Sequence, residues 1–439
     1  MILHEKIEAQ LPAWRERYKA LARDHSEVIV DQVTVGQIVG GMRDIRSLLT
    51  DISYVDPAHG ILFRGMTIPQ VLESLPRGRG AKIPLVGGLY YLLMVGEVPT
   101  HEQALEVESE WARRAELPDY VHKMLKAMPR DTHPMILFSQ AVMALARDSI
   151  FTKSYHEGMR KDAYWRPALD DSLDLTAKLP VIAAFIYRHK YFSERTKPRF
   201  HARWDYGSNF ARMMKVTDKK GYADLARLYF ILHSDHESGN VSAHTTHLVG
   251  SSLSDIYFAF AAGLSGLAGP LHGLANQESL GWLIGMRDKF GELATKEQVR
   301  QHALETLESG RVIPGYGHGV LRVVDPRYMA QLQFARLRFP EDELLRLAEL
   351  VLEVVPELLK EQGKAKDPAP NVDAISGTLQ YHYGVREFDF YTVLFGVGRA
   401  LGVTANYVWA RALGQPIERP KSVTMKMLEG AVKTGSTPS

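Results

Sequence analysis

Three residues in this chain are candidates for proton-transfer chemistry: His272, His318 and Asp373. His272 lies in Gly-Pro-Leu-His-Gly, His318 in Gly-Tyr-Gly-His-Gly, and Asp373 in Asn-Val-Asp-Ala-Ile-Ser-Gly. Glycines beside a histidine let the backbone bend closely around a ligand, and they also let a loop act as a hinge. Two imidazoles and a carboxylate on such loops suit acid–base chemistry near neutral pH.

The arginines point to an anionic ligand. Arg399 lies in an apolar stretch that has no Asp or Glu between Asp389 and Glu418. Because an unpaired buried guanidinium is costly, its partner must be either a distant acid of the fold or a bound anion. Arginine binds carboxylates in a bidentate manner. If Arg327 and Arg419 join Arg399, the ligand carries more than one carboxylate.

Four further histidines invite a metal hypothesis, since His233 and His236, and likewise His244 and His247, are spaced i, i+3. Acidic residues accompany only the first pair, and no histidine-rich zinc signature fits. We therefore expect no metal site; structural histidines, or one substrate-contacting histidine among the four, are the favoured interpretation.

The remaining motifs are weaker indications of function. Lys364 and Lys366, in Gly-Lys-Ala-Lys-Asp-Pro, are either a solvated basic loop or phosphate contacts, and by themselves they favour the solvated loop. The phosphate-loop and dinucleotide-binding fingerprints are absent, so NAD or ATP binding through those folds is not expected. A serine hydrolase is a weak alternative because no Gly-x-Ser-x-Gly motif occurs.

The elements that must position these residues are mostly helical. Apolar residues at three-four spacing predict a helix over 344–358 that ends before Gly363, with a kink or early end at Pro356. Further helices are expected over 171–189, 224–233 and 390–410. The last is long enough to span a membrane, but Arg399 near its middle favours a buried helix. Short β pieces are expected at 28–30 and near the turn at 56–60.

Bulk composition fits a soluble globular enzyme. The chain has 439 residues, 45% hydrophobic and 24% charged, with a net charge of +2 and no cysteine. The low net charge argues against a nucleic-acid binder, and the absence of cysteine excludes disulfides and thiolate chemistry. No signal or transit peptide is recognised, so we expect a cytoplasmic protein, or a mitochondrial matrix protein if a presequence has been trimmed.

Glycine-rich segments divide the second half of the chain. They lie at 263–269, at 310–319 and after Asp373. They are either plain loops between helices or hinges of a smaller, mobile domain. We predict a large domain formed by residues 1–271 and 379–439, with a small domain at 272–378.

Several of these segments, taken together, resemble citrate synthase of the type found in mitochondria and in some bacteria. The similar segments are 232–245, 266–278, 312–322, 325–328, 363–373, 391–397, 399–403 and 418–422. Their order and spacing agree with the family from about Gly40 to Ser422. The resemblance implies an all-α fold with minor β structure near the N-terminal region, and a homodimer with a large and a smaller mobile domain.

The resemblance also implies a reaction. Acetyl-CoA would be a co-substrate, with no tightly bound cofactor, and would condense with oxaloacetate through an enol or enolate. Hydrolysis of citryl-CoA would then release citrate and CoA. In this comparison Asp373 matches the base, His272 matches the donor to the developing enolate oxygen, and His318 matches the group that protonates the oxaloacetate carbonyl.

The remaining matches are binding residues. His236, Arg327, Arg399 and Arg419 match oxaloacetate contacts, with Arg419 expected from the partner subunit, so that the active site would be shared. The matches for CoA contacts are Arg43, Arg322, Lys364 and Lys366. Here the resemblance raises the phosphate interpretation of the two lysines above the solvated one. Neither nucleic acid nor membrane is expected as a partner.

Some positions depart from the family pattern. Ile375 stands where many members carry histidine, and Gly319 stands where alanine is frequent. Neither change removes a matched catalytic group, but Ile375 lies two residues from Asp373, where it bears on packing or on the choice of acyl substrate. Two alternatives therefore stay open: a 2-methylcitrate synthase that uses propionyl-CoA, and a non-catalytic helical scaffold that keeps the fold.

Overall fold

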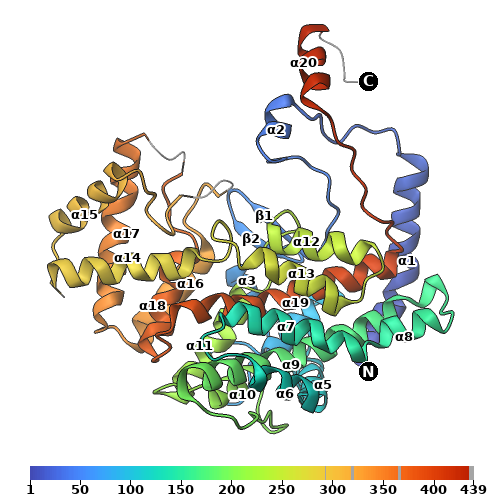
Figure 1. The fold of residues 1–439 in the computed structure, drawn as a ribbon, viewed down its shortest axis with the longest axis horizontal. Coiled ribbons are helices and arrows are strands. Elements are labelled where there is room, and N and C mark those ends of the chain that lie inside the picture. Colours follow the sequence, from blue (N-terminus) through green and yellow to red (C-terminus); the bar gives the residue numbers. More distant parts are fainter. Residues whose placement is uncertain (292, 318–320, 364–366, 435–439) are drawn as a thin grey trace.

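The structure is a computed structural model that describes residues 1–291, 293–317, 321–363 and 367–434. Helices account for most of it (Figure 1). The first half contains α1 (Ile2–Asp24), α2 (Val35–Val39), α3 (Ile68–Ser74), α4 (Val86–Val95), α5 (His101–Arg114), α6 (Asp119–Ala127), α7 (Pro134–Leu145), α8 (Ile150–His156), α9 (Trp165–Phe192), α10 (Tyr206–Met213) and α11 (Lys219–Leu232). The second half contains α12 (Val241–Ser251), α13 (Ile256–Leu267), α14 (Ala275–Phe290), α15 (Lys296–Glu308), α16 (Pro326–Arg338), α17 (Glu343–Glu361), α18 (Asp373–His382), α19 (Tyr391–Leu413) and α20 (Met425–Thr434).

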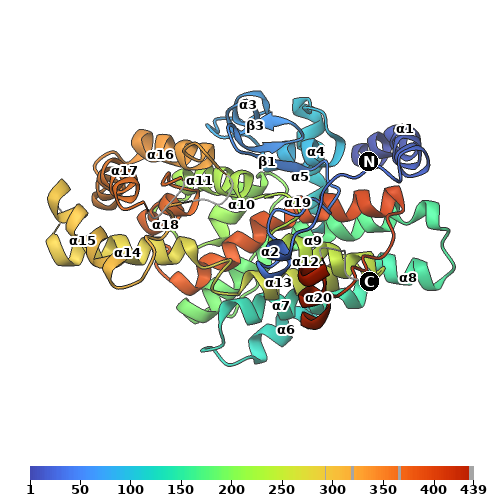
Figure 2. The same ribbon diagram turned by 90° about the horizontal axis from the view of Figure 1, so that it is seen from above.

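One small sheet is present in the described part of the chain. Its strands β1 (Ser53–Asp56), β2 (Gly60–Phe63) and β3 (Met66–Thr67) pair antiparallel in the order β1-β2-β3. The turn predicted at 56–60 joins β1 to β2, with Asp56 opposite Gly60. In Figure 2 the sheet and α3 lie on the opposite side of α19 from α6 and α7. The prediction of an all-α fold with minor β structure is confirmed.

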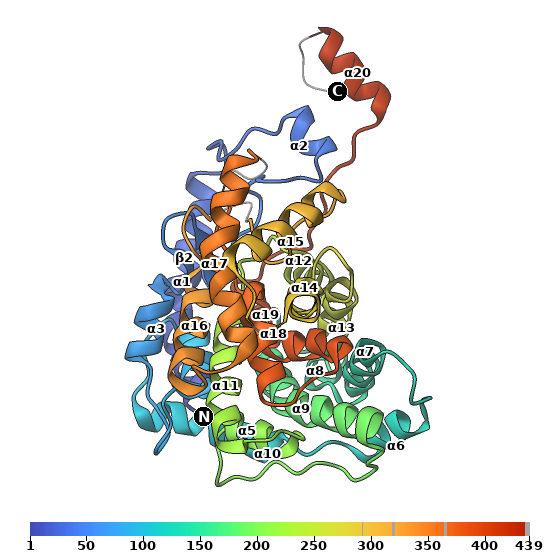
Figure 3. The ribbon, with the colours of Figure 1, turned by 90° about the vertical axis from the view of Figure 1, so that its left-hand side faces the viewer.

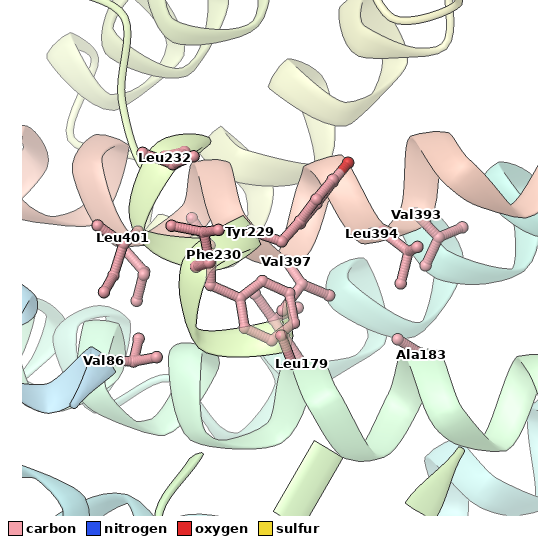
Figure 4. Close-up of a cluster of buried hydrophobic side chains, with 14 of the residues drawn as sticks. Val86, Leu179, Ala183, Tyr229, Phe230, Leu232, Val393, Leu394, Val397 and Leu401 are labelled. Carbon is pink, nitrogen blue, oxygen red and sulfur yellow. The ribbon is translucent and has the colours of Figure 1, made fainter. Parts of the chain in front are cut away.

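Helix α19 forms the centre of the core, which explains its apolar sequence. Figure 4 shows Val393, Val397 and Leu401 of this helix meeting side chains of α4, α9 and α11. All of the labelled side chains are at most 1% exposed. The helix ends at Gly414, whose φ of 71° is left-handed. The predicted buried helix over 390–410 is therefore confirmed.

Close approach to a neighbouring loop explains a glycine in α19. A Cβ on Gly402 would lie 2.4 Å from Cβ of Asp235, and the Gly402 N–H donates to the Ser234 carbonyl at 3.0 Å. Only glycine permits that contact. The loop between α11 and α12 is thereby pressed against the central helix.

The helix predicted from the 344–358 stripe exists, but Pro356 does not end it. Helix α17 runs on to Glu361. Proline removes one backbone hydrogen bond and crowds the preceding turn, yet Val351, Val355 and Leu358 are buried on the core side and their packing holds the helix. Gly363, with φ of 61°, follows the helix end as predicted.

Helices α14 to α18 gather at one side of the molecule, on the left of Figure 1 in yellow and orange. Figure 3 looks at this side directly. Helices α14 to α17 lie within residues 272–378, which we predicted to form a small domain, whereas α18 begins there and extends past that boundary to His382.

Two segments project from the body. Residues 25–50, which include α2, and the C-terminal α20 extend to the top of Figures 1 and 3. Val28, Ile29 and Val30 are 63–74% exposed and form no strand, so the β structure expected at 28–30 was a wrong prediction. A β-branched run needs a pairing partner, and this segment has none in the described chain.

One stretch, Pro134–His156, is long and apolar enough to cross a membrane by length and composition alone. It is not a single helix, because a 3-10 turn at Ala146–Asp148 separates α7 from α8. Leu137, Phe138, Val142 and Phe151 within it are at most 2% exposed. Part of this stretch therefore belongs to the protein core.

Candidate active site

A cavity of about 200 Å³ brings most of the predicted site residues together. The side chains that line it are His233, His236, Asn240, His272, Arg327, Asn371, Val372, Asp373, Phe395 and Arg399. They come from the loop between α11 and α12, the segment before α14, the first turns of α16 and α18, and α19. The sequence separates the first from the last of these residues by more than 160 positions.

Helix N-termini surround this cavity. Helices α12, α16 and α18 begin at or beside the lining residues Asn240, Arg327 and Asp373. The N-terminus of a helix carries a partial positive charge that favours anions. Together with two buried arginines, these ends make the cavity a site for a negatively charged ligand.

Hydrogen bonds fix the orientation and tautomer of His272. The Ser242 backbone N–H donates to His272 Nε2 at 3.3 Å, and the Ser242 hydroxyl oxygen lies 2.9 Å from the same nitrogen. Because a backbone N–H can only donate, Nε2 must accept and the ring proton sits on Nδ1. Burial, with Arg399 nearby, lowers the pKa of His272 to about 4, so the ring is neutral at physiological pH.

Arg399 is 3% exposed and binds neutral partners. Its Nη1 donates to Asn240 Oδ1 at 2.9 Å and to Ser242 Oγ at 3.3 Å, while its Nε makes no hydrogen bond to the described part of the chain. Among the described residues, no carboxylate lies within 4.0 Å of the guanidinium. Burial lowers its pKa to about 10, partly offset by Asp235, so it remains charged. This geometry favours the bound anion as its missing partner.

Among the described residues, Arg327, unlike Arg399, is paired with a carboxylate. It is buried, and its Nε and Nη2 donate to the fully buried Asp325 at 3.1 and 2.7 Å. Asp325 also caps α16, because it accepts the Arg327 backbone N–H at 2.9 Å. The ion pair fixes the guanidinium plane at the wall of the cavity and leaves Nη1 outside the contact with Asp325.

Asp373 opens α18 at the edge of the same cavity. Its backbone N–H donates to Asn371 Oδ1 at 2.9 Å. Burial raises the pKa of its carboxyl to about 6; Arg327 and Arg399 oppose that rise, and Asp325 adds to it. A carboxylate with a pKa near the working pH is suited to act as a general base.

His318 lies outside the described residues, but the segment before it runs beside Asp373. The Gly317 N–H donates to the Ala369 carbonyl at 3.1 Å, and the Asn371 N–H donates to the Gly315 carbonyl at 2.9 Å. A Cβ on Gly315, whose φ is 79°, would lie 2.6 Å from Cα of Ala374. Glycine is required there, and it lets the two predicted loops approach each other.

His233 is a cavity residue that the sequence analysis did not single out from its three neighbours. Its Nδ1 donates to the Tyr229 carbonyl at 2.9 Å, and its ring stacks on Tyr229 at 4.0 Å. Burial lowers its pKa to about 3, so it is neutral. His236 also lines the cavity, whereas His244 contacts Glu418 at 3.2 Å. Periodicity alone did not distinguish these roles.

Other predicted binding residues lie away from this cavity. Arg322 is exposed, and its backbone N–H donates to the Pro57 carbonyl at 2.8 Å. Arg43 is exposed on the projecting segment 25–50, and Arg419 is exposed on the segment between α19 and α20. Lys364 and Lys366 lie outside the described residues. Ile375 is fully buried in α18 and does not line the cavity.

A larger cavity of about 500 Å³ lies between α1, the sheet and α4. Arg64 and Asp51 are among its lining residues, but it contains no predicted catalytic residue. Size alone is therefore a poor guide, and we take the cavity where histidines, arginines and a carboxylate converge as the candidate site.

Comparison with known proteins agrees with this fold. The family model described as citrate synthase, C-terminal domain, matches residues 41–421. A probable mitochondrial citrate synthase of Glossina morsitans morsitans is 49% identical over 97% of this chain and 91% of its own length. Mitochondrial citrate synthase 4 of Arabidopsis thaliana is 48% identical over 99% of this chain and 91% of its own length.

Solved structures share the fold. Citrate synthase from Pyrobaculum aerophilum matches with a TM-score of 0.76 and 25% identity, covering 91% of this chain and 97% of that one. Citrate synthase from Thermoplasma acidophilum, solved as a ternary complex with carboxymethyl coenzyme A and oxaloacetate, matches with a TM-score of 0.73 and 22% identity over 90% and 97% of the two chains. The family match over residues 41–421, with two relatives almost half identical, shows that this chain belongs to the citrate synthase family.

Proposed function

We propose that the cavity between α11, α16, α18 and α19 is where this chain carries out the family's reaction, the condensation of acetyl-CoA with oxaloacetate. The observation that carries the proposal is the convergence of a neutral His272, an acidic Asp373 and two buried arginines on one cavity. The names of the relatives favour citrate formation over the propionyl-CoA alternative and over a non-catalytic scaffold.

Enolate formation is the first step. The methyl protons of an acetyl thioester are very weakly acidic, so Asp373 needs assistance to remove one. The Nδ1–H of His272 supplies it by donating a hydrogen bond to the thioester oxygen as negative charge develops there. A preorganised donor of this kind typically contributes about 10²–10³ in rate. The geometry at Ser242 supports this role, because it leaves the ring proton on Nδ1.

Oxaloacetate occupies the electropositive part of the cavity. Arg399, Arg327 and His236 bind its carboxylates and carbonyl region, and His318 protonates the carbonyl oxygen as the new carbon–carbon bond forms. The unpaired Nε of Arg399 supports the assignment, since a carboxylate would satisfy it. The complex with oxaloacetate described for the Thermoplasma acidophilum protein is consistent with an oxaloacetate site in this fold.

Acetyl-CoA binds beside oxaloacetate. Arg43, Arg322, Lys364 and Lys366 contact the phosphate-bearing part of CoA, and no tightly bound cofactor takes part. Residues 272–378 move as a small domain against the remainder of the chain, closing over both substrates and excluding water until citryl-CoA has formed.

A homodimer completes the site. Exposed apolar side chains cluster on the neighbouring helices α7, α12 and α13: Ile136, Met143, Val241, Leu248 and Phe258 are 43–53% exposed. An apolar surface of this kind favours protein association. The exposed Arg419 is next to Glu418, which contacts His244 and Ser251 of α12, and we assign Arg419 to the oxaloacetate site of the partner subunit.

Three relatives carry mitochondrial names. They favour the mitochondrial matrix, the second of the two compartments expected from the sequence, over the cytoplasm. Fractionation of source cells, followed with an antibody against this chain, would decide between them.

Release of CoA tests the proposed reaction. Thiol appearance from acetyl-CoA should require oxaloacetate, and propionyl-CoA should give a lower kcat/KM. Release of CoA that is independent of oxaloacetate would contradict the condensation, and a higher kcat/KM with propionyl-CoA would favour the alternative.

A further inference from the structure

A third cavity, of about 410 Å³, lies at the N-terminal end of α11, whereas His233 of the proposed active site follows the C-terminal end of that helix. Its walls are the loop before α4, the helices α10 and α11, and the C-terminal end of α16. Figures 1 and 3 show α10 at one end of the molecule, far from the projecting segments. Its volume lies in the range of small-molecule sites, roughly 300–1,000 Å³.

Positive charge dominates this cavity. Six cationic side chains reach it from the surface: Arg79, Lys82, Arg212, Lys219, Lys220 and Arg338. A seventh, Arg227, is 5% exposed and forms the floor. Among its described lining residues the only acid is Asp224, in a chain whose net charge is +2 over 439 residues. So many like charges repel one another unless an anion lies between them.

The carboxylates near this cavity, those of Asp224 and Asp205, already form ion pairs. Asp224 is 4% exposed; it accepts from Arg227 at 2.8 Å and from the Lys82 backbone N–H at 3.1 Å, and it also pairs with Arg338. Asp205 pairs with Arg227 at 2.7 Å. By contrast, no carboxylate of the described chain forms an ion pair with Arg79, Lys82, Arg212, Lys219 or Lys220.

Specific contacts and a helix terminus position the cationic side chains of this cavity. The Lys82 N–H contact with Asp224 anchors the loop that carries Arg79, and Arg212 lies over the Trp204 ring at 3.8 Å. Lys219 and Lys220 form the first turn of α11, where the helix dipole adds to their charge. The cations therefore come from separate elements and converge on one volume.

We propose that this basic cavity binds a small polyphosphate anion, and that its occupancy is transmitted to the active site through α16. Arg327, in the first turn of that helix, lines the active-site cavity, and Arg338, its last residue, lines the basic cavity. The two arginines are eleven positions apart, a rise of about 16 Å along the helix. An anion that draws Arg338 from Asp224 would shift the end of a rigid element whose other end holds Arg327.

Titration calorimetry of the full-length protein with inorganic tripolyphosphate tests the binding. One site per chain is expected at constant ionic strength. Arg212→Gln/Lys220→Gln should weaken binding at least about tenfold, because two unpaired cations are lost. The matched control Lys123→Gln/Lys126→Gln removes the same charge from the exposed face of α6 and should bind like the wild type. Equal affinity in both variants would overturn the site.

CoA also carries phosphates, so the proposed CoA site needs its own control. Lys364→Gln/Lys366→Gln should retain tripolyphosphate binding. If it loses binding while Arg212→Gln/Lys220→Gln keeps it, the anion occupies the CoA site and the basic cavity is refuted.

Kinetics tests the coupling, which rests on the proposed function, whereas the calorimetry does not. At saturating acetyl-CoA, tripolyphosphate should change the KM for oxaloacetate at least about twofold in the wild type. Arg338→Gln should abolish this change. An unchanged KM in the wild type, with the site shown to be occupied, would refute the coupling through α16.

Discussion

Asp373 is the residue on which the proposed chemistry depends most directly. It begins α18, so its carboxylate meets the positive end of a helix, yet burial raises its pKa to about 6. The two effects together keep the carboxylate ionised near neutral pH while leaving it basic enough to take a proton. His272, with its pKa lowered to about 4, stays neutral beside it and can only donate from Nδ1.

The titration of Asp373 predicts an acid limb in activity. Because its pKa lies above the usual value, the carboxyl binds a proton as pH falls through about 6, and the base form is lost there. We expect kcat/KM to fall about tenfold per pH unit below that point. Asp373→Asn should lower kcat at least about 10²-fold and remove the limb. Asp288→Asn, at an exposed acid, is the control; an intact limb in the Asp373 variant would contradict the assignment.

Arg399 gives a residue-scale prediction about binding. Arg399→Met should raise the KM for oxaloacetate about 10- to 100-fold, because a charge-assisted hydrogen bond is worth about 1.5–3 kcal/mol. It should cost little stability without ligand, since the guanidinium is buried without a carboxylate. Thermal unfolding without ligand measures the stability. The loss of binding is measured by the ligand-dependent shift: oxaloacetate should raise the Tm of the wild type but not of the variant.

Arg411→Met is the matched control for this experiment. Arg411 lies in the same helix, is also 3% exposed and also has an unpaired Nε, but it does not line the cavity. A normal rise in Tm with oxaloacetate is therefore expected. If both variants respond equally, Arg399 is not a ligand contact.

At the scale of elements, the site depends on how closely α19 approaches the loop between α11 and α12. Gly402 makes that approach possible, and the loop then carries His233 and His236 to the cavity. A second close approach, at Gly315, sets the segment before His318 against the start of α18. Both contacts join parts of the chain that are distant in sequence.

Gly402→Ala should therefore destabilise the fold by about 1–3 kcal/mol, the usual cost of forcing extra atoms into a packed interior. The added methyl would lie 2.4 Å from Cβ of Asp235. Gly285→Ala in α14 is the control, because nothing lies within 4 Å of its Cβ and alanine favours a helix. Urea unfolding gives both values; equal stability of the two variants would show that the close contact has no energetic weight.

At the scale of the whole molecule, the proposed dimer joins two sites through Arg419. Leu248→Lys/Phe258→Lys on α12 and α13 should yield monomers with little activity, measured by light scattering and CoA release. Burying two lysines at an apolar interface is unfavourable. Leu337→Lys is the control, since Leu337 is 77% exposed on α16, away from this surface. A variant that remains dimeric would place the interface elsewhere.

Complementation tests the shared site separately. Arg419→Ala and His272→Ala homodimers should both be inactive. Mixed and refolded together, they should regain about a quarter of wild-type activity, since half the dimers are mixed and each mixed dimer holds one intact site. No recovery in verified heterodimers would contradict the assignment of Arg419 to the partner subunit.

The sequence by itself determined the helical character of the chain, the burial of 390–410, and the residue types of the site, because periodicity and glycine-flanked polar residues are local properties. It did not distinguish His233 from its neighbours, its alternative of an early end at Pro356 was wrong because α17 runs on to Glu361, and the β structure expected at 28–30 was wrong. These outcomes depend on packing partners far away in sequence. Only the tertiary structure decided that His272 accepts at Nε2, that Arg399 has no carboxylate partner among the described residues, and that α16 links two cavities, since each depends on a contact between distant segments.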